Sequence, residues 1–177
     1  MVAPASDKSN DNAIGGTMAN GQAFANALAQ YVSTMKAQGI NLLAVSVQNE
    51  PDANVSYESC SYTGATLASF IGTFMGPALA DSGVSIIAPE THNWCDFPNY
   101  APAIFSNAAA ACTSIIATHE YGCTPPTFNS AVHQVLSSGN AGETPNPAMI
   151  WWAMPGLMTT SVALLDPARS ETEDKLE

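Results

Sequence analysis

The sequence has few basic residues and no long apolar run. Lys and Arg together number 4, against 15 Asp and Glu, which gives a formal net charge of −11. A chain with so little positive charge has no basic patch to follow a phosphate backbone, so nucleic acid is excluded as a partner. Its apolar stretches are shorter than the roughly 20 residues that cross a bilayer, and residues 1–12 lack the pattern of an export signal. We therefore expect no membrane span.

Cysteine is scarce and is not spaced as a metal ligand set. The four cysteines show no C-x-x-C spacing, which argues against a zinc or redox motif and allows three disulfide pairings. Cys60 and Cys95 both follow predicted strands at the same rim, so we predict a disulfide between them; Cys112 with Cys123 is the second choice. The sequence predicts no metal site and no cofactor.

What remains is an apolar, weakly charged chain of one domain. Of its 177 residues, 46% are hydrophobic and 11% are charged, which is enough apolar surface for one core. We assign this domain to residues 1–165. Residues 166–177 end in SETEDKLE and are expected to form a charged, disordered tail.

Helical and strand patterns alternate along the chain. Apolar residues at helical spacing predict helices over residues 22–38, 66–80, 100–111 and 128–137, and short apolar runs predict strands over 41–47, 84–88, 114–118 and 148–153. Strands separated by helices indicate βα units around a parallel sheet, which fits a doubly wound sheet or a (β/α)8 barrel.

The placement of polar residues favours the barrel. QNEPD, PETHNW and THEYG each follow a predicted strand, and a barrel builds its active site from such strand ends. No Gly-rich phosphate loop follows any strand, which disfavours a nucleotide-binding sheet. A complete barrel needs about 250 residues, so we predict a partial (β/α)8 barrel.

The segment VSVQNEPD carries the main catalytic candidate. Glu50 ends an apolar strand and is followed by Pro51, which fixes the chain direction, so its carboxylate can be held at one geometry in a cleft. The simpler interpretation is that Glu50 only caps or solvates a loop. The residues around it decide between the two.

Those residues resemble glycoside hydrolase family 30, whose members are retaining enzymes with a (β/α)8 barrel. The matching segments, in order, are APASDKSNDNAIGG, SVQNEPDANVSYESCSYT, GPALADSGVSIIAPETHNW and IIATHEYG. Ser6 and Asp7 depart from the pattern, because an aromatic residue and Met usually precede Lys-Ser-Asn in the family. The resemblance covers about residues 3–124 and implies that the chain holds barrel strands 4 to 7.

The resemblance also implies roles for individual residues. Glu50 matches the general acid/base, and Asn49 matches the residue that binds the sugar 2-hydroxyl. Trp94 matches an aromatic residue lining the cleft, and His119 and Tyr121 match polar groups near the nucleophile. The implied partner is a β-linked polysaccharide, with β-1,4-xylan first and β-1,6-glucan, β-1,6-galactan or glucosylceramide-like glycosides as alternatives. The implied location is extracellular.

The expected nucleophile is missing from the sequence. The family places it in a segment resembling Trp-x-Thr-Glu after strand 7, where this chain has MIWWAMPGLMTTSVALLD. Glu120, Glu143 and Asp166 are distant substitutes. Two other hypotheses follow: a non-catalytic product that still binds sugar, or a partial barrel that does not fold alone because its sheet edges are open.

Overall fold

The structure is a computed structural model that describes residues 2–93, 95–105, 108–119 and 121, together with the strand segments 148–151 and 162–163. The elements follow one another in this order: the 3-10 helix η1 (Ala5–Asp7), α1 (Gly21–Ala37), β1 (Ala44–Ser46), α2 (Gly64–Phe70), the π-helical turn η2 (Ile71–Met75), α3 (Gly76–Leu79), β2 (Ser85–Thr91), α4 (Phe97–Phe105), α5 (Ala108–Cys112), β3 (Thr113–Thr118), β4 (Ala148–Trp151) and β5 (Val162–Ala163).

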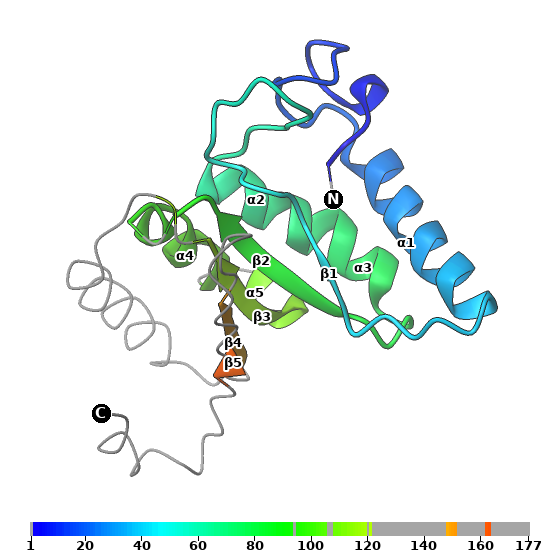
Figure 1. Cartoon of the computed structure of the whole chain (residues 1–177). Helices are drawn as coiled ribbons and strands as arrows, with labels where there is room; N and C mark the ends of the chain where they lie inside the picture. Colours follow the sequence, from blue (N-terminus) through cyan, green and yellow to red (C-terminus); the bar gives the residue numbers. More distant parts are fainter. Residues whose placement is uncertain are drawn as a thin grey trace, which may run out of the picture.

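The strands form one sheet in the order β1-β2-β3-β4-β5 (Figure 1). Strands β1 to β4 are parallel, and helices connect β1 to β2 and β2 to β3. This confirms the predicted α/β class with helices between parallel strands. Strand β5 pairs antiparallel with β4 and was not predicted. The assignment of these strands to positions 4 to 7 of a barrel stays a prediction.

The first two helices begin and end where the sequence indicates. The Asn20 side chain accepts a hydrogen bond from the backbone N–H of Ala23 at the start of α1, and Gly39 takes a positive φ of 80° beyond its end. Thr63 and Thr66 form a reciprocal capping box at the start of α2. Helix α2 then runs through the π-helical turn into α3, so the predicted helix over 66–80 carries a wider turn in its middle.

The helix predicted over 100–111 is divided in the structure. Helix α4 starts earlier, at Phe97, and contains Pro102, and α5 is a separate short helix that starts at Ala108. Strand β2 extends to Thr91, beyond the predicted end at residue 88, so it carries Glu90 within the sheet. The helix predicted over 128–137 lies outside the described residues.

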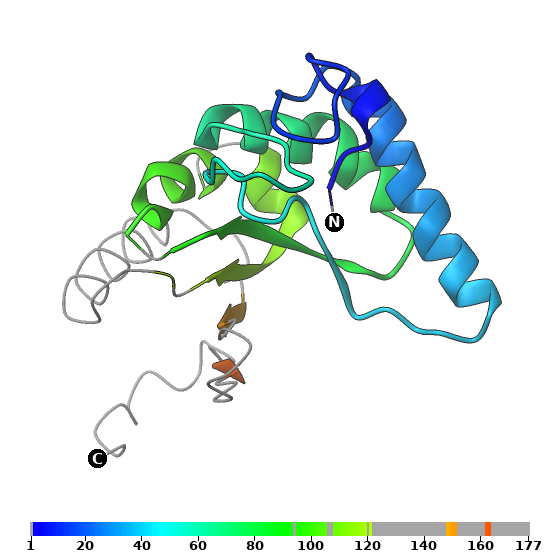
Figure 2. The same cartoon turned by 45° about the horizontal axis from the view of Figure 1, so that its top comes forward.

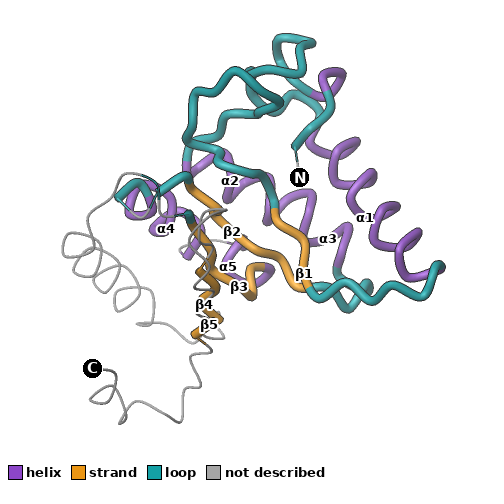
Figure 3. The backbone as a smooth tube through the Cα atoms, in the orientation of Figure 1, coloured by secondary structure: helices purple, strands orange, loops and turns teal. Residues whose placement is uncertain are grey.

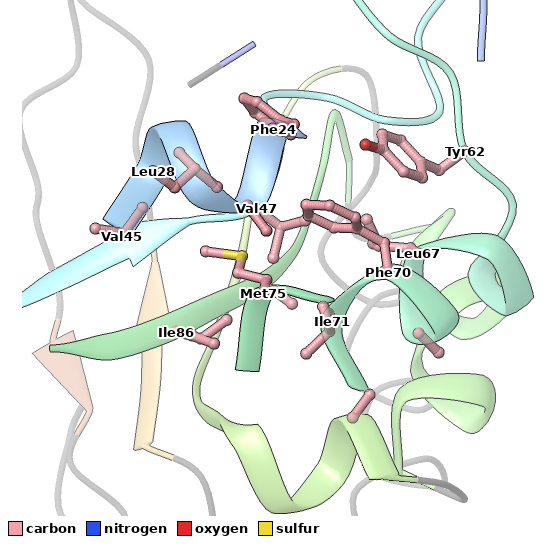
Figure 4. Close-up of a cluster of buried hydrophobic side chains, with 14 of the residues drawn as sticks. Phe24, Leu28, Val45, Val47, Tyr62, Leu67, Phe70, Ile71, Met75 and Ile86 are labelled. Carbon is pink, nitrogen blue, oxygen red and sulfur yellow. The ribbon is translucent and has the colours of Figure 1, made fainter. Parts of the chain in front are cut away.

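The core lies between the sheet and the helices on one of its faces (Figure 2). Val45, Val47 and Ile86 point toward the helices, where they meet Phe24 from α1 and the α2 and η2 side chains that Figure 4 shows around Met75. Alternate strand positions form a second, separate cluster of Ala44, Ile87, Ile115 and Ala117. The two clusters follow the two-residue repeat of a strand, so both faces of the sheet are apolar, as in a barrel.

Two irregular segments lie side by side at one end of the molecule, the N-terminal segment and the loop after β1 (Figure 3). The buried Lys8 joins them, because its Nζ donates hydrogen bonds to the carbonyls of Ala13 at 2.6 Å and Ser59 at 2.8 Å. Backbone bonds from Ser59 to Ala13 and from Ser61 to Gly16 run beside it. The N-terminal segment around Lys8 therefore holds the loop that follows Glu50 in place.

Candidate active site

Glu50 lies just past β1 and is fixed by three neighbours. Its φ is 47°, a left-handed conformation that is uncommon outside glycine, and its backbone N–H donates to the carbonyl of Glu90 at 3.0 Å. The side chain is 9% exposed. The Tyr57 hydroxyl donates to Oε2 at 2.7 Å, and His119 Nδ1 lies 2.7 Å from Oε1. A carboxylate held through both oxygens has a defined orientation, as general acid/base catalysis requires.

Tyr57 belongs to the loop after β1 and was missed by sequence reasoning. The residue is 53% exposed although its hydroxyl reaches the buried carboxylate of Glu50. The hydrogen bond to Glu50 is the main cause that raises the pKa of Tyr57 to about 12, with smaller contributions from burial and from the charge of Glu50. The hydroxyl therefore remains a donor throughout the physiological pH range.

Glu90 was also missed, although it lies in the PETHNW segment. It is 8% exposed and has a φ of 59°. Its Oε1 lies 3.7 Å from His119 Nε2, and its Oε2 has no hydrogen-bond partner among the described residues. The sequence placed the PETHNW segment at the same rim as Glu50, but it gave no sign of the backbone conformation that turns the Glu90 side chain toward His119.

His119 brings the two carboxylates together. It follows β3, and its backbone N–H donates to the Thr91 carbonyl at 2.8 Å. Burial lowers the pKa of His119, but the interactions with Glu90 and Glu50 outweigh burial, so the pKa lies above its ordinary value. Tyr121 packs against it with ring centroids 5.8 Å apart. The structure thus places the predicted residues His119 and Tyr121 at the same end of the sheet as Glu50.

The residues before Glu50 contribute an amide. Gln48 is fully buried, and its Nε2 donates to the backbone carbonyl of Asn49 at 2.9 Å. The Asn49 side chain is half-buried, and no hydrogen bond joins it to the other described residues. Its amide is consequently available to a ligand beside Glu50. Trp94, the remaining predicted contact, lies outside the described residues.

The predicted disulfide between Cys60 and Cys95 is wrong. Cys60 is a free, buried thiol, and Cys112 is also free, which removes the second choice with Cys123 as well. Cys60 packs in the main core beside Tyr62. Burial is the largest cause of its raised pKa, so the thiol stays protonated and acts as a small apolar core residue. A predicted position after a strand end was therefore not enough to bring the sulfur atoms of Cys60 and Cys95 together.

A second polar group lies beside the site, and its acidic and imidazole atoms are close enough together to consider a metal ion. Asp52, His92 and Asp96 place ligand atoms within 4.8 Å of one another. These atoms already bond to protein groups: Asp52 accepts from the His92 backbone at 2.8 Å, and Asp96 accepts from the Asn93 amide at 2.7 Å. We assign no metal there, and the absence of a metal site stays a prediction.

Within the described part of the chain, none of the helices has the length and apolar character to pass through a membrane.

This geometry defines an α/β protein whose parallel strands end in a buried carboxylate, an imidazole and a neighbouring amide. Known proteins of this class resemble the chain. Glucuronoxylanase XynC of Bacillus subtilis is 35% identical over 101 residues, which are 56% of this chain and 22% of that protein. No profile of a known protein family matches the sequence.

Solved structures agree with the sequence comparison. The catalytic domain of the family 30 xylanase C from Talaromyces cellulolyticus superposes with a TM-score of 0.63 at 30% identity, covering 68% of this chain and 31% of that one. The family 30 subfamily 8 xylanase from Clostridium acetobutylicum gives 0.64 at 25% identity, covering 85% and 46%. The endo-β-1,6-glucanase BT3312, at 22% identity and a TM-score of 0.71, shares the fold.

The chain is therefore a partial relative of glycoside hydrolase family 30, as its sequence motifs predict. It spans about a fifth of the length of the curated relative and one third to one half of the family 30 structures it matches.

Proposed function

We propose that this chain is part of a secreted retaining glycoside hydrolase that acts on a β-linked polysaccharide, with β-1,4-xylan as the first candidate. Support comes from the names of its relatives, a glucuronoxylanase and two xylanases. The single observation that carries the proposal is the placement of Glu50 at a strand end, buried and bonded through both carboxylate oxygens.

In this proposal Glu50 acts twice. It first protonates the departing glycosidic oxygen, and then, as a base, takes a proton from the water that releases the sugar from the enzyme. Asn49 binds the sugar 2-hydroxyl, an interaction that strengthens as charge develops at the reacting carbon. The exposed ring of Tyr57 adds a flat apolar surface beside Glu50 on which a sugar ring can stack.

The first step of such a reaction needs a second carboxylate roughly 5 to 5.5 Å away as nucleophile. Glu90 is the described carboxylate nearest to His119 after Glu50, but the imidazole separates the two glutamates. We therefore expect the chain alone to bind sugar and to cleave it very slowly. A product that binds polysaccharide without cleaving it is the alternative that this arrangement favours.

One pair of measurements tests the proposal. Calorimetric titration with xylohexaose is expected to show binding by the wild-type chain, and loss of at least about tenfold in affinity in Asn49→Ala, since a hydrogen bond of about 1.4 kcal/mol corresponds to tenfold. Release of reducing sugar from glucuronoxylan is expected to stay near background. A β-1,6-linked glucan oligosaccharide serves as the comparison ligand.

Glu50→Gln tests the role of Glu50 in the same two measurements. Its matched control is Glu58→Gln, because Glu58 is an exposed glutamate of the same loop. Absence of binding to any of these β-linked ligands by a folded chain would refute the proposal. Rapid xylan cleavage that disappears in Glu50→Gln but persists in Glu58→Gln would support the role of Glu50 and refute the expected low activity.

A further inference from the structure

The backbone of β2 turns Glu90 toward the site. In the pairing of β2 with β3, Pro89 lies opposite Ala117 and Thr91 lies opposite Thr118. Glu90 is therefore an extra residue with no partner of its own, and its φ of 59° marks the same irregularity. Such bulges change the direction of one side chain and are common beside active sites. The left-handed conformation is unfavourable for a residue other than glycine, and the surrounding contacts must offset its cost.

The ends of β2 and β3 are locked together around this bulge. The hydroxyls of Thr91 and Thr118 are fully buried and lie 2.6 Å apart, and the Thr118 hydroxyl also bonds the Thr91 carbonyl at 2.9 Å. His119 comes next in the chain and donates its backbone N–H to the same Thr91 carbonyl. The imidazole is thus held at a fixed place between two carboxylates rather than on a mobile loop.

Each ring nitrogen of His119 faces a different glutamate. Nδ1 is 2.7 Å from Glu50 Oε1, and Nε2 is 3.7 Å from Glu90 Oε1. Among the described residues, the other titratable groups near the ring are Tyr57, which bonds Glu50, and Tyr121, which packs on the imidazole. No Lys or Arg in the described part of the chain pairs with either glutamate. A protonated His119 is therefore the positive charge that can offset the repulsion between the carboxylates of Glu50 and Glu90.

We propose that Glu90 is a positioning residue that keeps His119 doubly protonated, and that His119 is the local proton store for Glu50. The Nδ1 proton moves along the short hydrogen bond to Glu50 Oε1, which leaves a neutral imidazole and a carboxylic acid. The remaining Nε2–H faces Glu90 Oε1 at 3.7 Å, which is beyond hydrogen-bond distance, so Glu90 acts on the ring through its charge. When Glu50 later takes a proton from water, the reverse transfer restores the imidazolium. The number of protons on the three groups balances over the cycle.

The burial of Glu90 is what makes this arrangement effective. A carboxylate that is 8% exposed interacts with the imidazolium through little water, so their attraction is much stronger than that of a surface pair. The raised pKa of His119 agrees with this, because the carboxylates of Glu90 and Glu50 outweigh the opposing effect of burial. The role assigned to Glu50 rests on the proposed function, whereas the protonation of His119 does not.

The test is a direct measurement of ring protonation in the full chain. Long-range nitrogen–proton correlation spectra of the 15N-labelled protein, recorded from pH 5 to 9, report whether each imidazole carries one proton or two. The His119 signals are assigned by their loss in His119→Gln. We expect His119 to carry two protons at pH 7 and to titrate above its ordinary value of about 6.5. In Glu90→Gln we expect the titration midpoint of His119 to fall by about one pH unit, which is a tenfold loss of proton affinity.

Glu90→Gln keeps the shape of the side chain and removes only its charge. Asp96→Asn is the matched control. Asp96 faces His92, so we expect this substitution to leave the titration of His119 unchanged. A His119 ring with a single proton at pH 7 in the wild type would overturn the proposal even if Glu90→Gln failed to fold. An unchanged titration in a folded Glu90→Gln would overturn it as well.

The outcomes separate this inference from the proposed function. If the chain binds no sugar while His119 titrates as expected, the function fails and the effect of Glu90 on the protonation of His119 stands. If sugar binds while His119 is neutral, the function stands and the role of Glu90 fails.

Discussion

At the scale of single residues, the site is built by unusual backbone conformations at two neighbouring strand ends. Glu50 and Glu90 both adopt positive φ, and the N–H of one bonds the carbonyl of the other. Both side chains are buried, where an ionised carboxylate is costly unless it has partners. Tyr57 and His119 provide those partners for Glu50. The same contacts that lower the cost of burial also orient the acid.

The contact between Tyr57 and Glu50 gives a prediction about stability. A hydrogen bond to a charged group contributes about 1.5–3 kcal/mol, and the exposure of Tyr57 brings the expected value down to about 1 kcal/mol. In a double-mutant cycle of Tyr57→Phe and Glu50→Gln, urea unfolding is expected to show a coupling free energy near this value. Tyr31→Phe is the control, since Tyr31 is also partly exposed. Coupling within error of zero would mean that the contact does not stabilise the fold.

At the scale of elements, the sequence predicted the helices and strands better than the site. The sequence located α1, β2 and β3, because burial of one helix face leaves apolar residues at helical spacing and burial of both strand faces leaves a short continuous apolar run. It also placed Glu50, Asn49 and His119 at strand ends. The bulge at Glu90 leaves no such record, since it depends on the pairing of β2 with β3. The cysteine prediction failed for a similar reason: strand-end position does not fix sulfur distances.

The loop after β1 gives the second prediction, which concerns Lys8. This lysine is 4% exposed, and its ammonium group satisfies the carbonyls of Ala13 and Ser59. Lys8→Met keeps much of the side-chain volume but leaves both carbonyls without that donor, so we expect the free energy of unfolding to fall by about 1–3 kcal/mol. Chemical denaturation measures it.

Lys36→Met is the matched control, because Lys36 is an exposed lysine of α1 and its replacement is expected to change stability by less than about 0.5 kcal/mol. Equal effects of the two substitutions would show that Lys8 does not hold the N-terminal segment to the loop.

At the scale of the whole molecule, the main core lies between the helices and one face of the sheet. Strand β1 pairs with β2, and within the described residues no strand pairs with its other edge. Leu43, directly before β1, is 77% exposed, and Ile40 is 47% exposed. An open parallel edge with apolar residues beside it can pair with another chain. This is a physical reason for the hypothesis that the isolated chain folds poorly.

The net charge and the buried tyrosines together predict how stability depends on pH. Tyr100 donates its hydroxyl to the Tyr62 carbonyl at 2.6 Å, and burial is the largest cause that raises its pKa to about 12. The pKa of Tyr62 is also raised, mainly by burial. In the unfolded chain both groups ionise near pH 10. Their contribution to stability is therefore fully present below pH 10 and is lost as the pH rises toward 12. The charge of −11 becomes still more negative over this range and adds repulsion.

We therefore expect the free energy of unfolding in urea to fall gradually above about pH 8.5, where the Cys60 thiol ionises in the unfolded chain, and steeply above about pH 10. Tyr100→Phe should be less stable at pH 8 by about 1 kcal/mol, because the bond to Tyr62 is lost, yet its stability should fall less steeply above pH 10. Tyr31→Phe should keep the wild-type slope, since Tyr31 lies on the surface. If Tyr100→Phe and the wild-type chain lose stability in parallel above pH 10, repulsion between surface charges rather than tyrosine burial controls alkaline unfolding.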